Sequence, residues 1–256
     1  MKISYKNTEI YYTVEGEGKE LVLLHGFLHS SKMWNDYVSI WKKSFQVIRI
    51  DLPGHGESGI VENISIAEMA QIVKLICDQE KIIKPTIIGH SMGGYTGLAF
   101  VEQFPESINK LILLNSSANA DSIEVVKKRN IWLKIIDRHP SMFVRSVTEF
   151  LYSKENLIKL KDIVEENIQD SKSIGYDGYI EAIKAMRDRP SRIEVLKSNH
   201  DISLVAGVFD KVIEKEVSQE QMNMLAIGKG VFLEKAAHMG FLEDKEKCFE
   251  VLNGLI

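Results

Sequence analysis

One serine of this sequence has the neighbours that a nucleophile on a sharp turn requires. Ser91 lies between Gly89 and Gly93, after the β-branched run 86–88 and before the helix-compatible run 95–104. In this strand–turn–helix context the turn lifts the hydroxyl off the sheet and holds the serine in strained dihedral angles. Residues two positions before and after the serine must then be small to avoid clashes, as both glycines are. A glycine-rich turn with an incidental serine is the alternative.

A serine hydroxyl is a poor nucleophile unless a base takes its proton and a third group orients that base. Among the seven histidines, His238 follows a strand-like run and precedes the last predicted helix. The carboxyl end of a strand is where an α/β sheet places its chemistry, so His238 is the predicted base, with a buried structural histidine as the alternative. The remaining histidines suit local hydrogen bonds in turns or surface positions: His25, His29, His55, His90, His139 and His200.

The acid that would orient His238 is predicted by the same argument. Asp210 follows the strand-like run 202–206 and therefore lies at its carboxyl end. Asp201 precedes that run and lies at the wrong end, and Asp121 lies early in a long helical segment. A solvated loop aspartate is the alternative for Asp210.

The stretches between these residues alternate between strand-like and helix-like patterns. Strands are predicted over residues 3–5, 9–14, 21–24, 45–50, 86–88, 110–114, 202–206 and 231–233, the first two as an edge hairpin. Helices are predicted over residues 31–43, from a capping box at Ser65 and Glu68 to Cys77, and over 95–104, 218–225 and 243–255. This alternation predicts an α/β fold with a mostly parallel eight-stranded sheet and helices on both faces.

Residues 120–189 interrupt this alternation. They show only helical spacing, punctuated by Pro140 and Gly175 and closed by Pro190. We therefore expect a core of residues 1–118 and 191–256 with an inserted all-helical cap over 119–190.

Composition narrows the class of protein. The chain has 256 residues, 45% of them hydrophobic and 27% charged, as in ordinary globular proteins. A net charge of −4 with no basic tract argues against a nucleic-acid partner. The longest basic run, residues 127–129, is interpreted as a solvated helix face.

Cysteine usage and hydropathy point to a reduced compartment. Cys77 and Cys248 lie among apolar neighbours and are expected to be buried free thiols, and no Cys/His spacing predicts a metal site. The first residues lack the apolar core of a signal peptide, and no run approaches the ~18 apolar residues of a membrane span. We therefore expect a cytoplasmic protein.

The order Ser91, Asp210, His238 resembles that of the α/β-hydrolase fold family. Other pieces that match are His25-Gly26-Phe27, the loop 51–58 (Asp-Leu-Pro-Gly-His-Gly-Glu-Ser) and Gly207-x-x-Asp210, and the likeness extends from about residue 9 to the C-terminus. The resemblance implies that the backbone N–H groups of Phe27 and Met92 form an oxyanion hole. It does not identify the substrate. The sharp turn that carries Ser91 corresponds to the family's nucleophile elbow, here called the elbow. The family's dehalogenases and epoxide hydrolases carry aspartate at this position, so Ser91 argues against both.

The sequence also predicts part of the lining of a substrate pocket. Leu28, Tyr95, Trp132 and Met239 are the expected pocket residues. Most of the cap's other aromatic side chains are expected to pack helix against helix. Arg187 and Arg189 could bind an acidic substrate, but a solvated helix end is the favoured interpretation.

The sequence therefore predicts a serine hydrolase that needs no cofactor or metal and cleaves a carboxylic ester or related acyl compound through an acyl-enzyme on Ser91. The expected partner is a small-molecule acyl substrate. The alternatives are a hydrolase of carbon–carbon bonds in diketone-like substrates that uses the same three residues, and a small-ligand-binding protein with little turnover. The sequence leaves the oligomeric state open.

Overall fold

The computed structural model describes the backbone of residues 1–256 and the side chains of residues 1–172 and 175–256. Its strands form one eight-stranded sheet in the order β1-β2-β4-β3-β5-β6-β7-β8. The β1–β2 and β2–β4 pairs are antiparallel and the other pairs are parallel, so the predicted sheet is confirmed. The strands are β1 (Lys2–Tyr5), β2 (Thr8–Glu15), β3 (Lys19–Leu24), β4 (Phe45–Ile50), β5 (Thr86–His90), β6 (Lys110–Leu114), β7 (Asp201–Gly207) and β8 (Gly230–Leu233).

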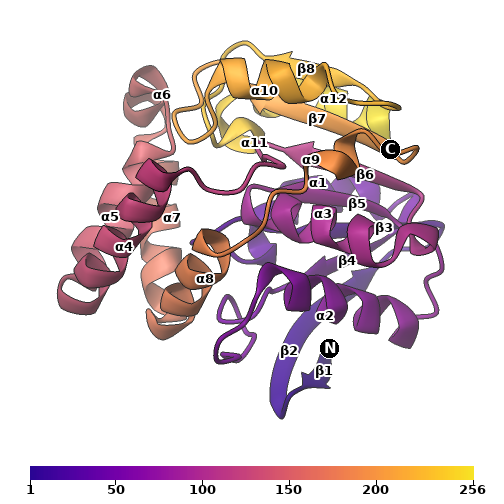
Figure 1. The fold of residues 1–256 in the computed structure, drawn as a ribbon, viewed down its shortest axis with the longest axis horizontal. Helices are drawn as coiled ribbons and strands as arrows, with labels where there is room; N and C mark the ends of the chain where they lie inside the picture. Colours follow the sequence, from indigo (N-terminus) through magenta and orange to yellow (C-terminus); the bar gives the residue numbers. More distant parts are fainter.

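Helices cover both faces of this sheet (Figure 1). Leu21 and Leu23 of β3 face one hydrophobic core with α1 and α12, while Val22 and Leu24 face another core with α2 and α3. All four side chains are fully buried, which explains the continuous apolar run. The helices outside residues 119–190 are α1 (Asn35–Trp41), α2 (Ile66–Gln79), α3 (Met92–Gln103), α9 (Ile193–Leu196), α10 (Lys215–Met222), α11 (Gly240–Glu243) and α12 (Lys245–Leu255), with 3₁₀ turns η1 (Ser31–Trp34) and η2 (Pro105–Ser107).

Five helices lie between β6 and β7 in the chain, and together they stand beside the sheet in Figure 1. We call them the helical block: α4 (Ile123–Arg138), α5 (Pro140–Phe150), α6 (Lys154–Lys159), α7 (Lys161–Ile174) and α8 (Asp177–Arg187). Helix α4 packs against α5 and α8, and α5 packs against α7. As predicted, the described backbone of this segment has no strand, while its division from a core at residues 119 and 190 stays a prediction.

Several element boundaries differ from the sequence prediction. The expected helix over 31–43 is the turn η1 followed by α1, because the Asp51 carboxylate accepts a hydrogen bond from the Ser31 amide and pins the start of this segment. The last helix is divided into α11 and α12 at Asp244, whose φ of −133° is not helical. The capping box of Ser65 and Glu68 and the two buried free cysteines are confirmed. Among the described residues, no helix has the length and hydropathy to cross a membrane.

Two glycines allow the helical block to pack closely against the loop that follows β4. Gly54 lies in the loop after β4 with a φ of +74°, and its Cα faces Gly178 at the start of α8. A Cβ on Gly178 would lie 2.1 Å from the Gly54 carbonyl oxygen, and a Cβ on Gly54 would lie 2.5 Å from the Gly178 Cα. Only residues without side chains allow two backbones to approach this closely.

This contact predicts that Gly178→Ala destabilises the protein by about 1–3 kcal/mol, because backbone must move to admit the methyl group. Gly254→Ala is the control, since a Cβ there meets nothing within 4 Å and should be neutral or stabilising by up to about 1 kcal/mol. Urea denaturation of both variants measures the difference in the free energy of unfolding. A Gly178→Ala protein as stable as the wild type would contradict the contact.

Candidate active site

Ser91 occupies a strained turn between β5 and α3, as the glycine spacing predicts. Its φ is 49° and its ψ is −113°. A Cβ on Gly89 would lie 2.4 Å from the Gly93 carbonyl oxygen, and one on Gly93 would lie 2.4 Å from the Leu24 carbonyl oxygen. A Cβ on Gly26 would lie 2.4 Å from His90 Nδ1. The turn therefore requires glycine on both sides of the serine and in the loop that passes over it.

The structure brings Ser91, His238 and Asp210 into one chain of hydrogen bonds. The Ser91 Oγ lies 2.8 Å from His238 Nε2, and His238 Nδ1 lies 2.8 Å from Asp210 Oδ2. The three residues follow the carboxyl ends of β5, β8 and β7. All three are buried, and Ser91 is 8% exposed. Such a chain can pass a proton from the serine to the imidazole.

The partners of Asp210 determine which imidazole nitrogen carries the proton. Asp210 Oδ1 accepts hydrogen bonds from the amides of Val212 and Ile213, and Oδ2 accepts one from Asn115 Nδ2. An ionised carboxylate can only accept, so His238 Nδ1 must donate to it. In the neutral imidazole Nε2 is then the free acceptor that faces the Ser91 hydroxyl.

Other elements hold the backbone around His238. Its amide donates to the Leu151 carbonyl oxygen at 3.0 Å, and its own carbonyl oxygen accepts from His90 Nε2 at 2.9 Å. Glu243 Oε2 accepts from the amides on either side of the histidine, those of Ala237 and Met239. His238 is therefore positioned by the segment between α5 and α6, by His90 and by α11 together.

Sequence reasoning did not identify Asn115 or Glu243. Asn115 donates to both Asp210 Oδ2 and the Ala237 carbonyl oxygen, and so joins the acid to the histidine loop. Its position directly after β6, where the carboxyl ends of strands gather, could have indicated it. Glu243 also accepts from the Ser153 amide, but glutamate is so rarely buried that no sequence signal separates it from surface residues.

Four buried histidines surround the elbow and are kept neutral. Burial lowers the pKa of His25 and of His55 to about 3 and the pKa of His29 to about 4. Burial also holds the pKa of His90 well below its usual range. His25 Nε2 accepts from the Leu52 amide, a bond that requires this nitrogen to be unprotonated. The prediction of local hydrogen bonding is confirmed for His25, His29 and His55, but it is wrong for His90, whose Nε2 bonds to the distant His238 carbonyl oxygen.

The two amides expected in an oxyanion hole flank the serine. Met92 is the first residue of α3, and Phe27 lies in the loop after β3. Within the described part of the chain neither amide donates a hydrogen bond, so both are available to an anion. The Phe27 ring packs against Trp132 of α4 and Tyr179 of α8, which ties this loop to the helical block. Their role as oxyanion donors stays a prediction.

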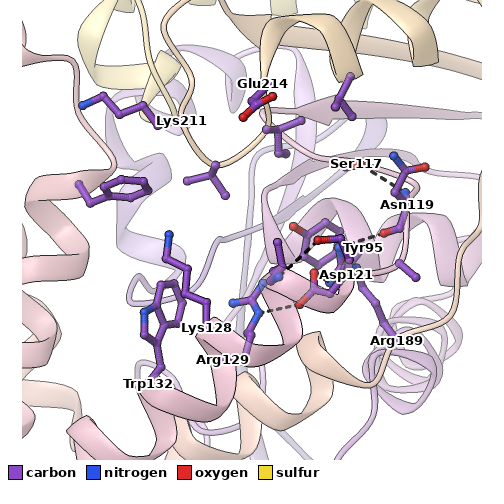
Figure 2. Close-up of a pocket in the computed structure, with 17 residues that line it drawn as sticks. Tyr95, Ser117, Asn119, Asp121, Lys128, Arg129, Trp132, Arg189, Lys211 and Glu214 are labelled. Carbon is purple, nitrogen blue, oxygen red and sulfur yellow. Dashed lines mark hydrogen bonds and ion pairs between the residues drawn. The ribbon is translucent and has the colours of Figure 1, made fainter.

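A cavity of about 350 Å³ lies between α4 and the loop after β7 (Figure 2), and its lining includes Tyr95 of α3 and Val212 and Ile213, whose amides bind Asp210. Tyr95 and Trp132, two of the four predicted pocket residues, line it, while its role as the substrate pocket stays a prediction. Leu28 instead lines a separate cavity of about 480 Å³, and Met239 is fully buried in the core with α1 and α12. Neither residue lines the first cavity: Leu28 packs in the core with α2 and α3, and Met239 lies on the opposite face of the sheet.

Two arginines that were expected at the surface are buried at this cavity. The solvated-face interpretation is wrong for Arg129, which is 7% exposed, and the solvated helix end is wrong for Arg189, which is 8% exposed. Both form ion pairs with Asp121, which draws the guanidinium groups inward. Asp121 is thus the counter-ion of two arginines and not a partner of His238. Arg187 is paired with Asp188 nearer the surface.

Among the described residues no group of three or more His, Cys, Asp and Glu side chains is placed to hold a metal ion. Asp201, the other competing acid, pairs with Lys110 at the opposite end of β7 from Asp210. His139 is exposed, and His200 interacts with Ser198 and the Pro105 carbonyl oxygen. The structure therefore brings one aspartate and one histidine to the serine.

Comparison with known proteins defines the family. A family model described as the alpha/beta hydrolase fold matches residues 20–151, more than half of the chain, and the chain therefore belongs to that family. A thermophilic esterase from Thermogutta terrifontis has a TM-score of 0.93 and 23% identity, covering 99% of this chain and 96% of that one. The enol-lactonase from Burkholderia xenovorans LB400 has a TM-score of 0.91 and 21% identity, covering 100% and 99%. At such identities the likeness establishes the fold alone.

Curated sequences match over a shorter stretch. A protein named 2-hydroxy-6-oxononadienedioate/2-hydroxy-6-oxononatrienedioate hydrolase from Escherichia coli O81 (strain ED1a) is 34% identical over 125 residues, which is 46% of this chain and 43% of that protein. An uncharacterized protein from Mycobacterium bovis is 31% identical over 116 residues, 45% of this chain and 34% of that protein. The match thus spans less than half the length of these curated relatives.

The partners of Asp210 predict the effect of Asp210→Asn. Both carboxylate oxygens accept from fixed donors, so an amide nitrogen would face a donor in either orientation. The imidazole would lose the acceptor that selects its tautomer, and we expect burst-phase acylation by a p-nitrophenyl ester to slow by about 10⁴-fold, as in serine proteases. Asp201→Asn, on the same strand but at its other end, should acylate at nearly the wild-type rate. Equal loss in both variants would exclude Asp210 as the orienting acid.

The buried histidines predict a dependence of stability on pH. The unfolded chain protonates these side chains near pH 6.5, whereas His25, His29 and His55 stay neutral in the folded protein until about pH 3 to 4. The unfolded state therefore binds more protons, and the free energy of unfolding should fall as the pH drops from about 7 to 5. Each histidine adds a slope approaching about 1.4 kcal/mol per pH unit.

Urea denaturation across this pH range measures the slope. His55→Phe should flatten it by removing one of the protons, while the exposed His139→Gln should leave it unchanged. A free energy of unfolding that is constant from pH 7 to 5 would contradict neutral burial.

Proposed function

We propose that this protein is a serine hydrolase that cleaves a carboxylic ester or related acyl compound through an acyl-enzyme on Ser91. The observation that carries the proposal is the hydrogen-bond chain from Ser91 Oγ through His238 to Asp210, with 2.8 Å at each step. The proposal is consistent with two further findings: the chain belongs to the alpha/beta hydrolase family, and proteins of similar fold include esterases.

In the proposed mechanism, Ser91 Oγ attacks the substrate carbonyl while His238 Nε2 takes its proton. Asp210 holds the imidazole tautomer and stabilises the imidazolium that forms. The amides of Phe27 and Met92 would bind the oxyanion, and each such donor is typically worth about 3 kcal/mol in the transition state. His238 then returns the proton to the leaving group, and a water molecule that His238 activates hydrolyses the acyl-enzyme.

We further propose that residues 119–190 act as a cap over this site, with residues 1–118 and 191–256 as the core. Trp132 of α4 contacts Phe27 and also lines the cavity, so the helical block would form one wall of the substrate pocket. The same block holds the His238 amide through Leu151. A cap with both contacts would set substrate preference and also keep the base in place.

A second candidate function is the hydrolysis of a carbon–carbon bond in a diketone-like substrate by the same three residues. One observation favours it, the 34% identity over 125 residues to the Escherichia coli hydrolase named above. Parallel assays with short and long p-nitrophenyl esters, thioesters and a diketone distinguish the two, because only the carbon–carbon hydrolase would turn over the diketone faster than the esters.

The proposal predicts that Ser91→Ala abolishes ester hydrolysis and fluorophosphonate labelling while the protein stays folded. The substitution removes only the hydroxyl that His238 contacts. Ser39→Ala, which changes an exposed serine of α1, is the matched control and should be labelled as the wild type is. If purified Ser91→Ala retained more than a few per cent of turnover, Ser91 would not be the nucleophile. A wild-type protein that binds acyl ligands without labelling would favour the small-ligand-binding alternative.

A further inference from the structure

We propose that the cavity beside Tyr95 binds a carboxylate carried by the substrate, and that Arg129, assisted by Lys128, recognises it. The inference rests on the proposed function, because it assigns a substrate class to the same site: acyl compounds with a free carboxylate at a distance from the bond that is cleaved.

The first observation is an incompletely paired guanidinium in a buried position. Arg129 Nε donates to Asp121 Oδ2 at 2.8 Å, and the side chain is 9% exposed. Within the described part of the chain its two terminal nitrogens have no hydrogen-bond acceptor. Arg189, by contrast, uses its terminal nitrogens on Asp121, the Met186 carbonyl oxygen and the Asn119 carbonyl oxygen. The free half of the Arg129 fork suits an oxyanion of planar geometry.

The second observation is the charge of the cavity wall. Its lining includes four cationic side chains, Lys128, Arg129, Arg189 and Lys211, and two carboxylates, Asp121 and Glu214. The side chains of this wall therefore carry a net positive charge, although the net charge of the whole chain is −4. Asp121 is already shared by two arginines, so it cannot neutralise both of them. An anionic ligand would compensate the remaining positive charge of this cavity wall.

The third observation is the arrangement of apolar surface beside the cations. Lys128 Nζ lies 4.5 Å from the centre of the Phe150 ring and 5.8 Å from that of Trp132, and Figure 2 shows Lys128 and Trp132 side by side on α4. Val212 adds an apolar surface from the loop that also caps Asp210. Tyr95, four residues after Ser91, lines the same cavity from α3, so a short hydrocarbon chain would lie along these side chains with its carboxylate at Arg129 and its acyl carbon toward Ser91.

The test compares two esters that differ only at the far end of the acyl chain: the mono-p-nitrophenyl ester of adipic acid and p-nitrophenyl hexanoate. We expect the wild type to prefer the adipate ester in kcat/KM. Arg129→Gln should lower the adipate-to-hexanoate ratio by about 10- to 100-fold, the usual worth of a buried hydrogen-bonded charge. Lys128→Gln, which changes an exposed residue, should lower the ratio by about threefold.

Two controls separate recognition from general damage. Arg138→Gln removes an exposed cation from the same helix but outside the cavity, and it should leave the ratio as in the wild type. Arg129→Lys should recover part of the preference, because it restores the charge without the fork. A ratio near one in the wild type, or a ratio that Arg129→Gln and Lys128→Gln leave unchanged, would overturn the inference.

Calorimetry with free adipate gives a readout that does not depend on catalysis. Adipate should bind the wild type and bind Arg129→Gln at least 10-fold more weakly. If neither ester is hydrolysed but adipate binds in this pattern, the carboxylate subsite stands and the proposed function fails. If both esters are hydrolysed at similar rates and adipate does not bind, the proposed function stands and the carboxylate subsite fails.

Discussion

Ser91 has a φ of 49° and a ψ of −113°, a backbone conformation that costs on the order of 1–3 kcal/mol and persists only where its surroundings impose it. Its amide donates to the Leu114 carbonyl oxygen of β6, and its carbonyl oxygen accepts from Ser116 Oγ. Side chains are absent at Gly89 and Gly93, so strand, turn and helix can close on one another. The sheet therefore holds the strained turn, and the turn presents the hydroxyl and the amides of α3 at one edge.

The position of His238 depends on parts of the chain that are far apart in sequence. Its amide is bound by Leu151 of the helical block, its carbonyl oxygen by His90 of the elbow, and the amides of its neighbours by Glu243. Through Ser153, Glu243 is also bonded to the helical block. The helical block therefore helps to orient one ring nitrogen of His238 toward Ser91, and it also lines the cavity.

Two buried aspartates illustrate how partners decide the role of a residue. Asp210 accepts from two amides, an asparagine and an imidazole, so its charge is satisfied by neutral donors and is directed at His238. Asp121 lies between Arg129 and Arg189, and its negative charge is compensated by their guanidinium groups. A carboxylate thus holds one imidazole in the first setting and two guanidinium groups in a cavity wall in the second.

The sequence by itself determined the sheet, the elbow and the three residues of the hydrogen-bond chain, because each follows from local rules. Apolar runs define buried strands, Gly89 and Gly93 mark the turn, and Asp210 and His238 each follow a strand. Only the tertiary structure decided that Glu243 clamps the histidine loop and that Arg129 turns inward to Asp121. Charged residues are normally exposed, and their burial depends on partners that only the folded chain brings together.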